Sequence, residues 1–297
     1  MSRSTGLRLA AAGSVLAGVL ALVTAVPATA GGHGDDRAPR YLALGDSVAF
    51  GYNPLLVHPG VNPHKFLGYP DLAARMLGPD LKVANASCVG ETSTSLITGT
   101  RPDHGCQDYR QFIGALHTYY TGSQLQYAED FVAANPRTKL ITLDIGANDL
   151  FILQESCSPA PDLGACISAG LPALLTTLSA NLVTIYSGLR AAGFTGDFVV
   201  VTYYSLNYAD PGSTGAIGAV DQVLAGVTTA FGGKVADGFS VFQAATAPFG
   251  GDACAAGLLI RFPDMSCDVH PSRAGAALLA HAVREAEGPM WPQHDDR

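Results

Sequence analysis

The chain has 297 residues, of which 48% are hydrophobic and 14% are charged, with 34 glycines and 18 prolines. This composition excludes a disordered or collagen-like chain, because the apolar content is high and the glycines follow no fixed period. The formal charge of −8 at pH 7 and the pI near 5.3 argue against nucleic acid as a partner, since phosphates would require a basic face.

The first thirty residues have the features of a secretory signal. Arg3 and Arg8 lie in a short polar start, residues 9–26 are apolar and uncharged, and the small residues 28–30 (Ala-Thr-Ala) follow. We expect cleavage after Ala30 and a secreted, extracellular protein. A permanent membrane anchor is the alternative, because a run of this length lies near the lower limit for spanning a bilayer. We expect no second apolar stretch of spanning length later in the chain.

All six cysteines lie beyond this segment. An even number of cysteines in an exported protein predicts three disulfides. Several connectivities are open, and the simplest joins sequence neighbours: Cys88–Cys106, Cys157–Cys166 and Cys254–Cys267. Free buried thiols are the alternative. A zinc site is disfavoured, because no two cysteines have the close spacing of metal-binding motifs.

The remaining chain divides into a polar leader at residues 31–39, one domain at 40–288 and a polar tail at 289–297. Short apolar runs predict buried strands at residues 41–44, 81–84, 140–145 and 198–203. Helical periodicity predicts helices at residues 69–77, 125–134, 171–191, 215–231 and 272–286, with Ser272 as an N-cap. This alternation favours an α/β fold with a mostly parallel sheet covered on both faces.

Polar motifs follow the predicted strands, where ligands bind in such sheets. Gly-Asp-Ser at residues 45–47 follows the first strand, Asn-Ala-Ser-Cys-Val-Gly at 85–90 the second, and Gly-Ala-Asn-Asp at 146–149 the third. His270 precedes the last helix. Each motif alone is typical of a turn, but the four in this order indicate a site. Three long segments predicted to be irregular could shape its cleft: residues 53–68, 96–122 and 153–170.

These four motifs resemble the conserved blocks of the SGNH hydrolases, the secreted esterases and lipases also called the GDSL family. The matching residues are Ser47, Gly90, Asn148 and His270, and the resemblance spans residues 40–287. It is nearest to the secreted actinobacterial branch with three disulfides. The resemblance implies a flavodoxin-like, three-layer αβα fold and the cleavage of carboxylic esters without a metal or other cofactor.

The chemistry of these residues agrees with the resemblance. A serine hydroxyl needs a base, and histidine suits this role because its pKa lies near neutrality. His270 would take the proton from Ser47 and return it to the leaving alcohol. The backbone N–H groups of Ser47 and Gly90 and the side-chain amide of Asn148 would bind the oxyanion. Asp46 and Asp149, next to these residues, are expected to brace turns.

The orienting acid departs from the family pattern. Family members commonly have an aspartate three residues before the histidine, but here that position is Cys267, and Asp268 lies only two residues before His270. We therefore expect a Ser47–His270 dyad whose ring N–H is held by the backbone carbonyl of Cys267. Asp268, or less favourably Asp264, as the third member of a triad is the alternative.

Three classes of function fit these motifs. The first is a secreted serine esterase or lipase, the second a carbohydrate acetylesterase of the same fold, and the third a non-catalytic protein that binds esters or glycans. We expect a monomer whose partner is a small-molecule or lipid ester. The acidic balance disfavours attraction to anionic membranes but leaves transient contact with a lipid interface open.

Overall fold

The computed structural model describes residues 38–288. The predicted signal segment, most of the leader and the tail at 289–297 lie outside the described residues. The described part is built on a five-stranded sheet in the order β2-β1-β3-β4-β5, in which every neighbouring pair is parallel. The strands are β1 (Arg40–Gly45), β2 (Lys82–Asn85), β3 (Thr138–Asp144), β4 (Asp197–Val201) and β5 (Lys234–Ala236).

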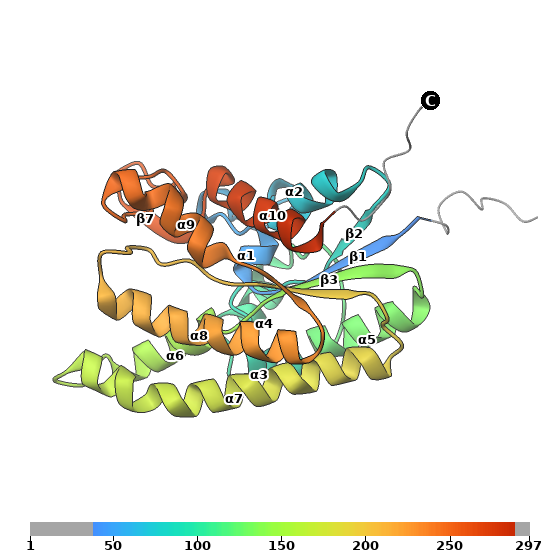
Figure 1. Cartoon of the computed structure of the whole chain (residues 1–297), viewed down its shortest axis with the longest axis horizontal. Coiled ribbons are helices and arrows are strands. Elements are labelled where there is room, and N and C mark those ends of the chain that lie inside the picture. The colour runs from blue at the N-terminus through green and yellow to red at the C-terminus, as the bar shows by residue number, and fades with distance from the viewer. Residues whose placement is uncertain (1–37, 289–297) are drawn as a thin grey trace, which may run out of the picture. The chain divides into compact units, whose positions relative to one another are not determined.

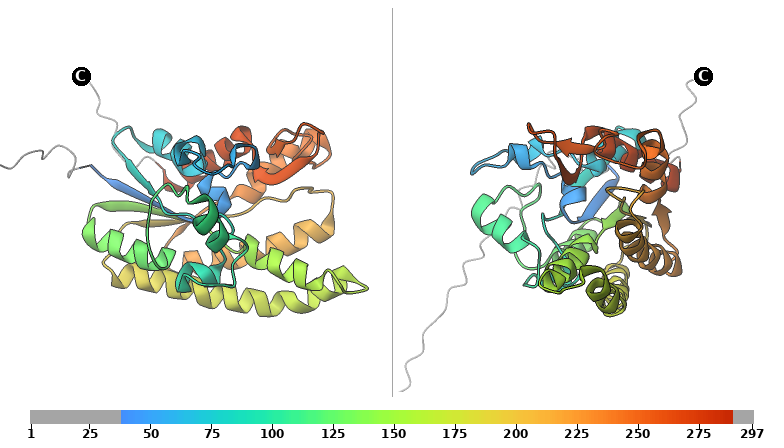
Figure 2. Two further views of the ribbon diagram at one scale, coloured as in Figure 1. Left: turned by 180° about the vertical axis from the view of Figure 1, so that it is seen from behind. Right: turned by 90° about the vertical axis from the view of Figure 1, so that its left-hand side faces the viewer.

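Helices cover both faces of this sheet (Figure 1). One layer contains α2 (Tyr69–Leu77), α9 (Gly238–Thr246) and α10 (Arg273–Glu287), and the other contains α3 (Ser93–Thr98), α5 (Gln124–Ala134), α6 (Ala147–Cys157), α7 (Leu163–Ala191) and α8 (Pro211–Ala230). The views in Figure 2 show the same two layers from behind and from the end. The predicted three-layer αβα fold is therefore confirmed, and the strand order is the flavodoxin-like one.

Short elements complete the described chain. They are α1 (Ser47–Phe50), α4 (Cys106–Asp108), the 3₁₀ turns at Pro54–Leu56, Pro63–Lys65 and Ala247–Phe249, a π-helical turn at Tyr109–Ile113, and the strands β6 (Leu259–Arg261) and β7 (Cys267–Pro271). The strands β6 and β7 pair in antiparallel fashion away from the central sheet. This hairpin carries His270.

Most predicted elements lie where the periodicity placed them, because their apolar faces are buried. Tyr41 and Leu44 in β1 and Phe198 in β4 are almost fully buried, as a sheet covered on both faces requires. The helix predicted at residues 69–77 has the same bounds as α2, and Ser272 caps α10 by accepting hydrogen bonds from Ala274 N and Gly275 N. The sequence prediction missed the strands β5, β6 and β7 and the helices α1, α3, α4, α6 and α9.

Residues 153–170, which we expected to be irregular, are mostly helical. α6 continues to Cys157, and α7 begins at Leu163, eight residues before the predicted start. The side chain of Asp162 caps α7 by accepting a hydrogen bond from Ala165 N at 2.9 Å. Pro172 lies within the helix. Because the predicted helix began at residue 171, it missed the first two turns of α7.

Helix α7 also corrects the expectation about apolar stretches. By length and composition alone it is apolar enough to cross a membrane. In the fold, however, Leu178, Leu182, Ile185 and Leu189 are buried on one face of α7, and α7 packs against its neighbouring helices α6 and α8. This face is the one that the step of three and four residues predicted.

The three disulfides are Cys88–Cys106, Cys157–Cys166 and Cys254–Cys267, as pairing of sequence neighbours predicted. No cysteine in the described part of the chain is free. Cys157–Cys166 joins the end of α6 to the first turn of α7. Cys254–Cys267 joins the start of β7 to the segment before β6, and so braces the hairpin that presents His270.

Candidate active site

Ser47 lies directly after β1, as the first residue of α1. Asp46 caps this helix, because its carboxylate accepts a hydrogen bond from Val48 N at 2.9 Å. The preceding Gly45 has φ +135°, and a Cβ there would lie 2.3 Å from the backbone oxygen of Asp144. Only glycine therefore permits this turn. It places Ser47 at the carboxyl edge of the sheet, where β1 is flanked by β2 and β3 and the strand order reverses.

His270 reaches Ser47 from the far end of the chain. The Ser47 Oγ and His270 Nε2 atoms are 2.8 Å apart, although 223 residues separate them in sequence. The ring of Tyr52 packs edge-on against the imidazole, with centroids 4.8 Å apart. The hydroxyl of Tyr204 donates to the backbone oxygen of Val269 at 2.7 Å and so anchors the strand beside His270. The structure therefore brings the two expected residues into hydrogen-bond contact.

The partner of the other ring nitrogen differs from our expectation. Nδ1 of His270 contacts the Asp268 carboxylate, not the backbone carbonyl of Cys267. The same oxygen, Oδ1, accepts a hydrogen bond from the His270 backbone N–H at 2.9 Å. An aspartate that bonds the backbone two residues ahead folds its side chain over the turn. This bond explains how a carboxylate only two residues away can reach the ring, and it corrects the dyad hypothesis.

The environment of Asp268 keeps it ionised. Partial burial raises the pKa of this carboxyl, but the hydrogen bonds from the ring and backbone of His270 outweigh burial, and the net pKa lies below its usual value. Asp264, the second alternative, is exposed and accepts hydrogen bonds from Ser266 N at 3.0 Å and Ser266 Oγ at 2.6 Å. It therefore belongs to a surface turn.

The three expected oxyanion donors differ in whether they already donate a hydrogen bond within the protein. In the described part of the chain, neither Ser47 N–H nor Gly90 N–H donates a hydrogen bond. Gly90 has φ +79°, and a Cβ there would lie 2.3 Å from His104 O, so its glycine is required for the fold of the loop. The Asn148 amide lies in the first turn of α6 and donates to Glu91 O at 2.9 Å and to Asp46 Oδ2 at 3.2 Å.

A buried acidic pair lies beneath the nucleophile. Asp46 Oδ2 also accepts from Tyr203 Oη at 2.5 Å, and Asp144 accepts from Tyr69 Oη at 2.8 Å and Ala49 N at 3.2 Å. Burial raises the pKa of both carboxyls, and the neighbouring Asp46 raises that of Asp144 further. Asp46 accepts hydrogen bonds from three donors and Asp144 from two, which agrees with the stronger rise in the pKa of Asp144.

Asp149 also braces its loop, as expected. Its carboxylate accepts hydrogen bonds from Ser93 N at 2.9 Å and Ser93 Oγ at 2.6 Å, which ties the start of α6 to the start of α3. Sequence reasoning missed four buried residues that hold the site together: Glu91, Gln124, Asp144 and Tyr203. The available signals were that Asp144 is a charged residue inside an apolar predicted strand and that Glu91 follows Gly90. Nothing in the sequence marked Gln124 or Tyr203.

A cavity of about 620 Å³ opens beside Ser47 and His270. Its walls come from α6, the first turns of α7 and the start of α8, and Tyr203 and Tyr204 also line it. Most of the larger side chains that line it are apolar: Leu150, Phe151, Leu163, Ile167, Leu171, Leu206 and Ile217. This size is within the range of small-molecule sites, about 300–1,000 Å³.

One group within residues 38–288 has the composition of a metal site. It consists of Cys88, Glu91 and Cys106, all buried. The two sulfurs are bonded to each other, however, so neither is available as a thiolate ligand. The candidate active site itself combines a serine, a histidine and a carboxylate, the combination of residues used in nucleophilic catalysis by a catalytic triad.

Comparisons with solved structures show the same fold. An extracellular lipase from Streptomyces rimosus is 16% identical, with a TM-score of 0.55 over 84% of this chain and 100% of that one. A phospholipase A1 from Streptomyces albidoflavus is 21% identical, with a TM-score of 0.52 over 84% and 99%. A variant of an acetyl xylan esterase from Geobacillus stearothermophilus is 15% identical, with a TM-score of 0.51 over 86% and 97%.

The comparison with curated proteins found no match. The family model of the GDSL-like lipases and acylhydrolases matches residues 43–278, which include Ser47, Gly90, Asn148 and His270. This match covers more than half of the chain and agrees with the fold of the solved structures. The chain therefore belongs to the GDSL-like lipase/acylhydrolase family, whose members are carboxylic ester hydrolases.

Proposed function

We propose that this protein is a secreted serine esterase that cleaves acyl esters through a Ser47–His270–Asp268 triad. The observation that carries the proposal is the continuous contact from Ser47 Oγ through the His270 ring to the Asp268 carboxylate. The three disulfides support export, because such bonds persist in oxidising compartments.

The reaction begins when His270 Nε2 takes the hydroxyl proton of Ser47 as Oγ attacks the ester carbonyl carbon. Asp268 holds the ring so that Nε2 faces the serine, and it stabilises the imidazolium that forms. The carbonyl π bond breaks, and its oxygen becomes an oxyanion. His270 then gives the proton to the leaving alcohol, and the Ser47 acyl-enzyme remains. A water molecule activated by the same base releases the acid.

The oxyanion is bound by N–H groups near Ser47. The Ser47 and Gly90 backbone N–H groups, which have no acceptor in the described part of the chain, are available for it. Asn148 joins them when its longer hydrogen bond, the one to Asp46 at 3.2 Å, gives way to the substrate oxygen. Its shorter bond to Glu91 O keeps the amide in place.

The apolar cavity supports an acyl chain longer than acetyl as the preferred substrate. Transfer of each methylene from water into such a cavity contributes about 0.8 kcal/mol to binding. Ile167 and Leu171 of α7 and Ile217 of α8 are among the apolar residues that line this space. An acetyl group would leave these side chains without contact, so the gain in transition-state binding should grow with chain length until the cavity is filled.

Hydrolysis of nitrophenyl esters from acetate to palmitate tests the proposal. We expect kcat/KM to rise from acetate to a medium-length chain, and Ser47→Ala to lose roughly 10⁶-fold in kcat. Covalent labelling by a fluorophosphonate should occur in the wild type and not in Ser47→Ala. A maximum at acetate would instead indicate a deacetylase. Failure of the folded wild type to hydrolyse any ester or to take the label would refute catalysis by Ser47.

A further inference from the structure

Two buried polar residues connect the loop that carries Gly90 to the turn that carries Ser47. Glu91 and Gln124 are 2% and 1% exposed, respectively. Gln124 Nε2 donates to Glu91 Oε2 at 3.0 Å and to Gly45 O at 3.0 Å, and Gln124 Oε1 accepts from Gly45 N at 2.6 Å. The Gln124 amide therefore forms hydrogen bonds with both the backbone N–H and the backbone C=O of Gly45, the last residue of β1.

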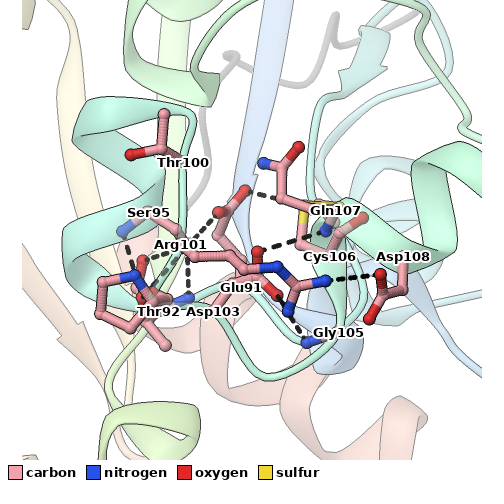
Figure 3. Close-up of polar contacts among 12 residues, drawn as sticks. Glu91, Thr92, Ser95, Thr100, Arg101, Asp103, Gly105, Cys106, Gln107 and Asp108 are labelled. Carbon is pink, nitrogen blue, oxygen red and sulfur yellow. Dashed lines mark hydrogen bonds and ion pairs between the residues drawn. A yellow bond between two sulfur atoms is a disulfide. The ribbon is translucent and has the colours of Figure 1, made fainter.

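Glu91 also holds the third oxyanion donor. Its backbone oxygen accepts the 2.9 Å bond from Asn148 Nδ2. Its carboxylate lies between Ser95, which donates to Oε1 at 2.5 Å, and the Cys88–Cys106 disulfide (Figure 3). One residue thus contacts groups from α3, α5 and α6, directly beside Gly90.

The mechanism above leaves this cluster without a role. A buried carboxylate is unfavourable unless its partners compensate for lost hydration, and an apolar pair at these positions would fill the same space. Burial raises the pKa of Glu91 to about 7, and of the charged neighbours Arg110 lowers that pKa and Asp103 raises it. The retained polar pair lies where the three oxyanion donors must keep fixed positions relative to Ser47 Oγ. A displacement of about 1 Å at such a site can lower turnover about 100-fold.

We propose that Glu91 and Gln124 form a positioning clamp that holds the Gly90 loop and Asn148 against the Gly45–Ser47 turn and so sets the geometry of the oxyanion site. This inference rests on the proposed esterase function. Neither residue touches the reacting atoms. Both act through the backbone of Gly45 and Glu91 and through the amide of Asn148.

An exchange of the donor and the acceptor tests the clamp. Gln124→Glu replaces the donor Nε2 by an oxygen, so the bond to Gly45 O is lost, and the bond to Glu91 survives only while the two acids share one proton. We expect kcat at pH 8 to fall at least about 10-fold, with KM changed by less than about 2-fold, because the transition state loses its aligned donors. The double variant Glu91→Gln/Gln124→Glu restores one donor–acceptor bond in the reverse direction, and the oxygen of the new amide still accepts from Ser95. It should recover part of the lost kcat, because the carboxylate at position 124 still cannot donate to Gly45 O.

A matched control removes a buried hydrogen bond elsewhere. Tyr186 and Thr228 bond at 2.7 Å between α7 and α8, and Thr228 is fully buried. Thr228→Val should lower Tm and leave kcat unchanged. Wild-type kcat in Gln124→Glu would overturn the clamp, and so would a folded double variant that recovers none of the lost kcat.

Amide hydrogen exchange gives a readout that does not depend on catalysis. Exchange in residues 88–92 should rise in Gln124→Glu, return toward wild type in the double variant and stay unchanged in Thr228→Val. If the wild type hydrolyses no ester, the proposed function fails, and this exchange pattern alone decides whether the clamp exists. Equal exchange in all four proteins would overturn it.

Discussion

Two substitutions of Asp268 can distinguish its two effects on His270, which are to orient the ring and to supply a negative charge beside it. One oxygen of Asp268, Oδ1, contacts both the ring Nδ1 and the backbone N–H of His270. In Asp268→Asn the amide oxygen can keep both contacts, so the ring keeps its tautomer and loses only the negative charge. A hydrogen bond to a charged group contributes about 1.5–3 kcal/mol and one between neutral groups about 0.5–1.5 kcal/mol. The difference of about 1–2 kcal/mol predicts a loss of roughly 5- to 30-fold in kcat/KM.

Asp268→Ala removes the acceptor altogether. The imidazole can then adopt the wrong tautomer, and we expect kcat to fall about 10⁴-fold. Steady-state hydrolysis of nitrophenyl butyrate measures both variants. Asp264→Ala is the matched control, because this nearby carboxylate is exposed and bonds Ser266 in its own turn. It should retain kcat within about 2-fold.

Two results would contradict this reasoning. An Asp268→Ala enzyme within about 10-fold of the wild type would mean that another group orients the ring, as the backbone carbonyl of Cys267 would in a dyad. An Asp268→Asn enzyme as slow as Asp268→Ala would show that the backbone N–H of His270 does not hold the amide oxygen toward the ring. Thermal unfolding of each variant establishes that the fold is retained.

Three further predictions concern the cavity, a disulfide and a buried acid. Ala216→Phe, in the wall formed by α8, should fill part of the cavity and move the best nitrophenyl ester toward acetate, as a chain-length series would show. Mild reduction of Cys254–Cys267 should lower kcat before the domain unfolds, because this disulfide closes the loop of 13 residues that presents His270 and contributes about 3 kcal/mol to stability. Unchanged kcat, after mass spectrometry has confirmed the reduction, would contradict this. Burial raises the pKa of Glu91 from 4.5 to about 7, so the folded chain binds this proton more tightly than the unfolded chain. Wild-type stability should therefore fall by about 3 kcal/mol as pH rises through this interval, whereas urea unfolding of Glu91→Gln should lack this dependence.

The layers of the fold were predictable because burial imposes a period on the sequence. Strands β1 and β3 are almost fully buried and read as apolar runs, and the buried face of α7 repeats every three or four residues. The start of α7 was not predictable from this period. Its first turns line the cavity or face solvent instead of packing on the sheet, so their apolar residues follow no helical stripe. The cap by Asp162 and the Cys157–Cys166 disulfide were the signals for this helix.

The proximity of Ser47 and Asn148, which we propose to touch the reacting atoms, was predictable, because parallel strands bring the ends of β1 and β3 to one edge. The arrangement of Asp268 relative to the His270 ring was harder to predict. The position of Asp268 depends on a hydrogen bond to the backbone two residues ahead, which counting residues before His270 does not reveal. The usual spacing of three is one way to reach Nδ1, and a folded-back turn with a spacing of two is another.

The buried residues around the site had the weakest signal in the sequence. Glu91 and Gln124 lie 33 residues apart, and each alone has the polarity of a surface residue. Their burial follows from pairing between a loop and the first residue of α5, and no periodicity records a pair of this kind. Because a buried carboxylate without partners is strongly destabilising, Glu91 can be retained only while Gln124 and Ser95 supply donors. The geometry of the oxyanion site therefore depends on side chains from three separate elements, and substitutions at Glu91 that remove its acceptor oxygens should lower kcat.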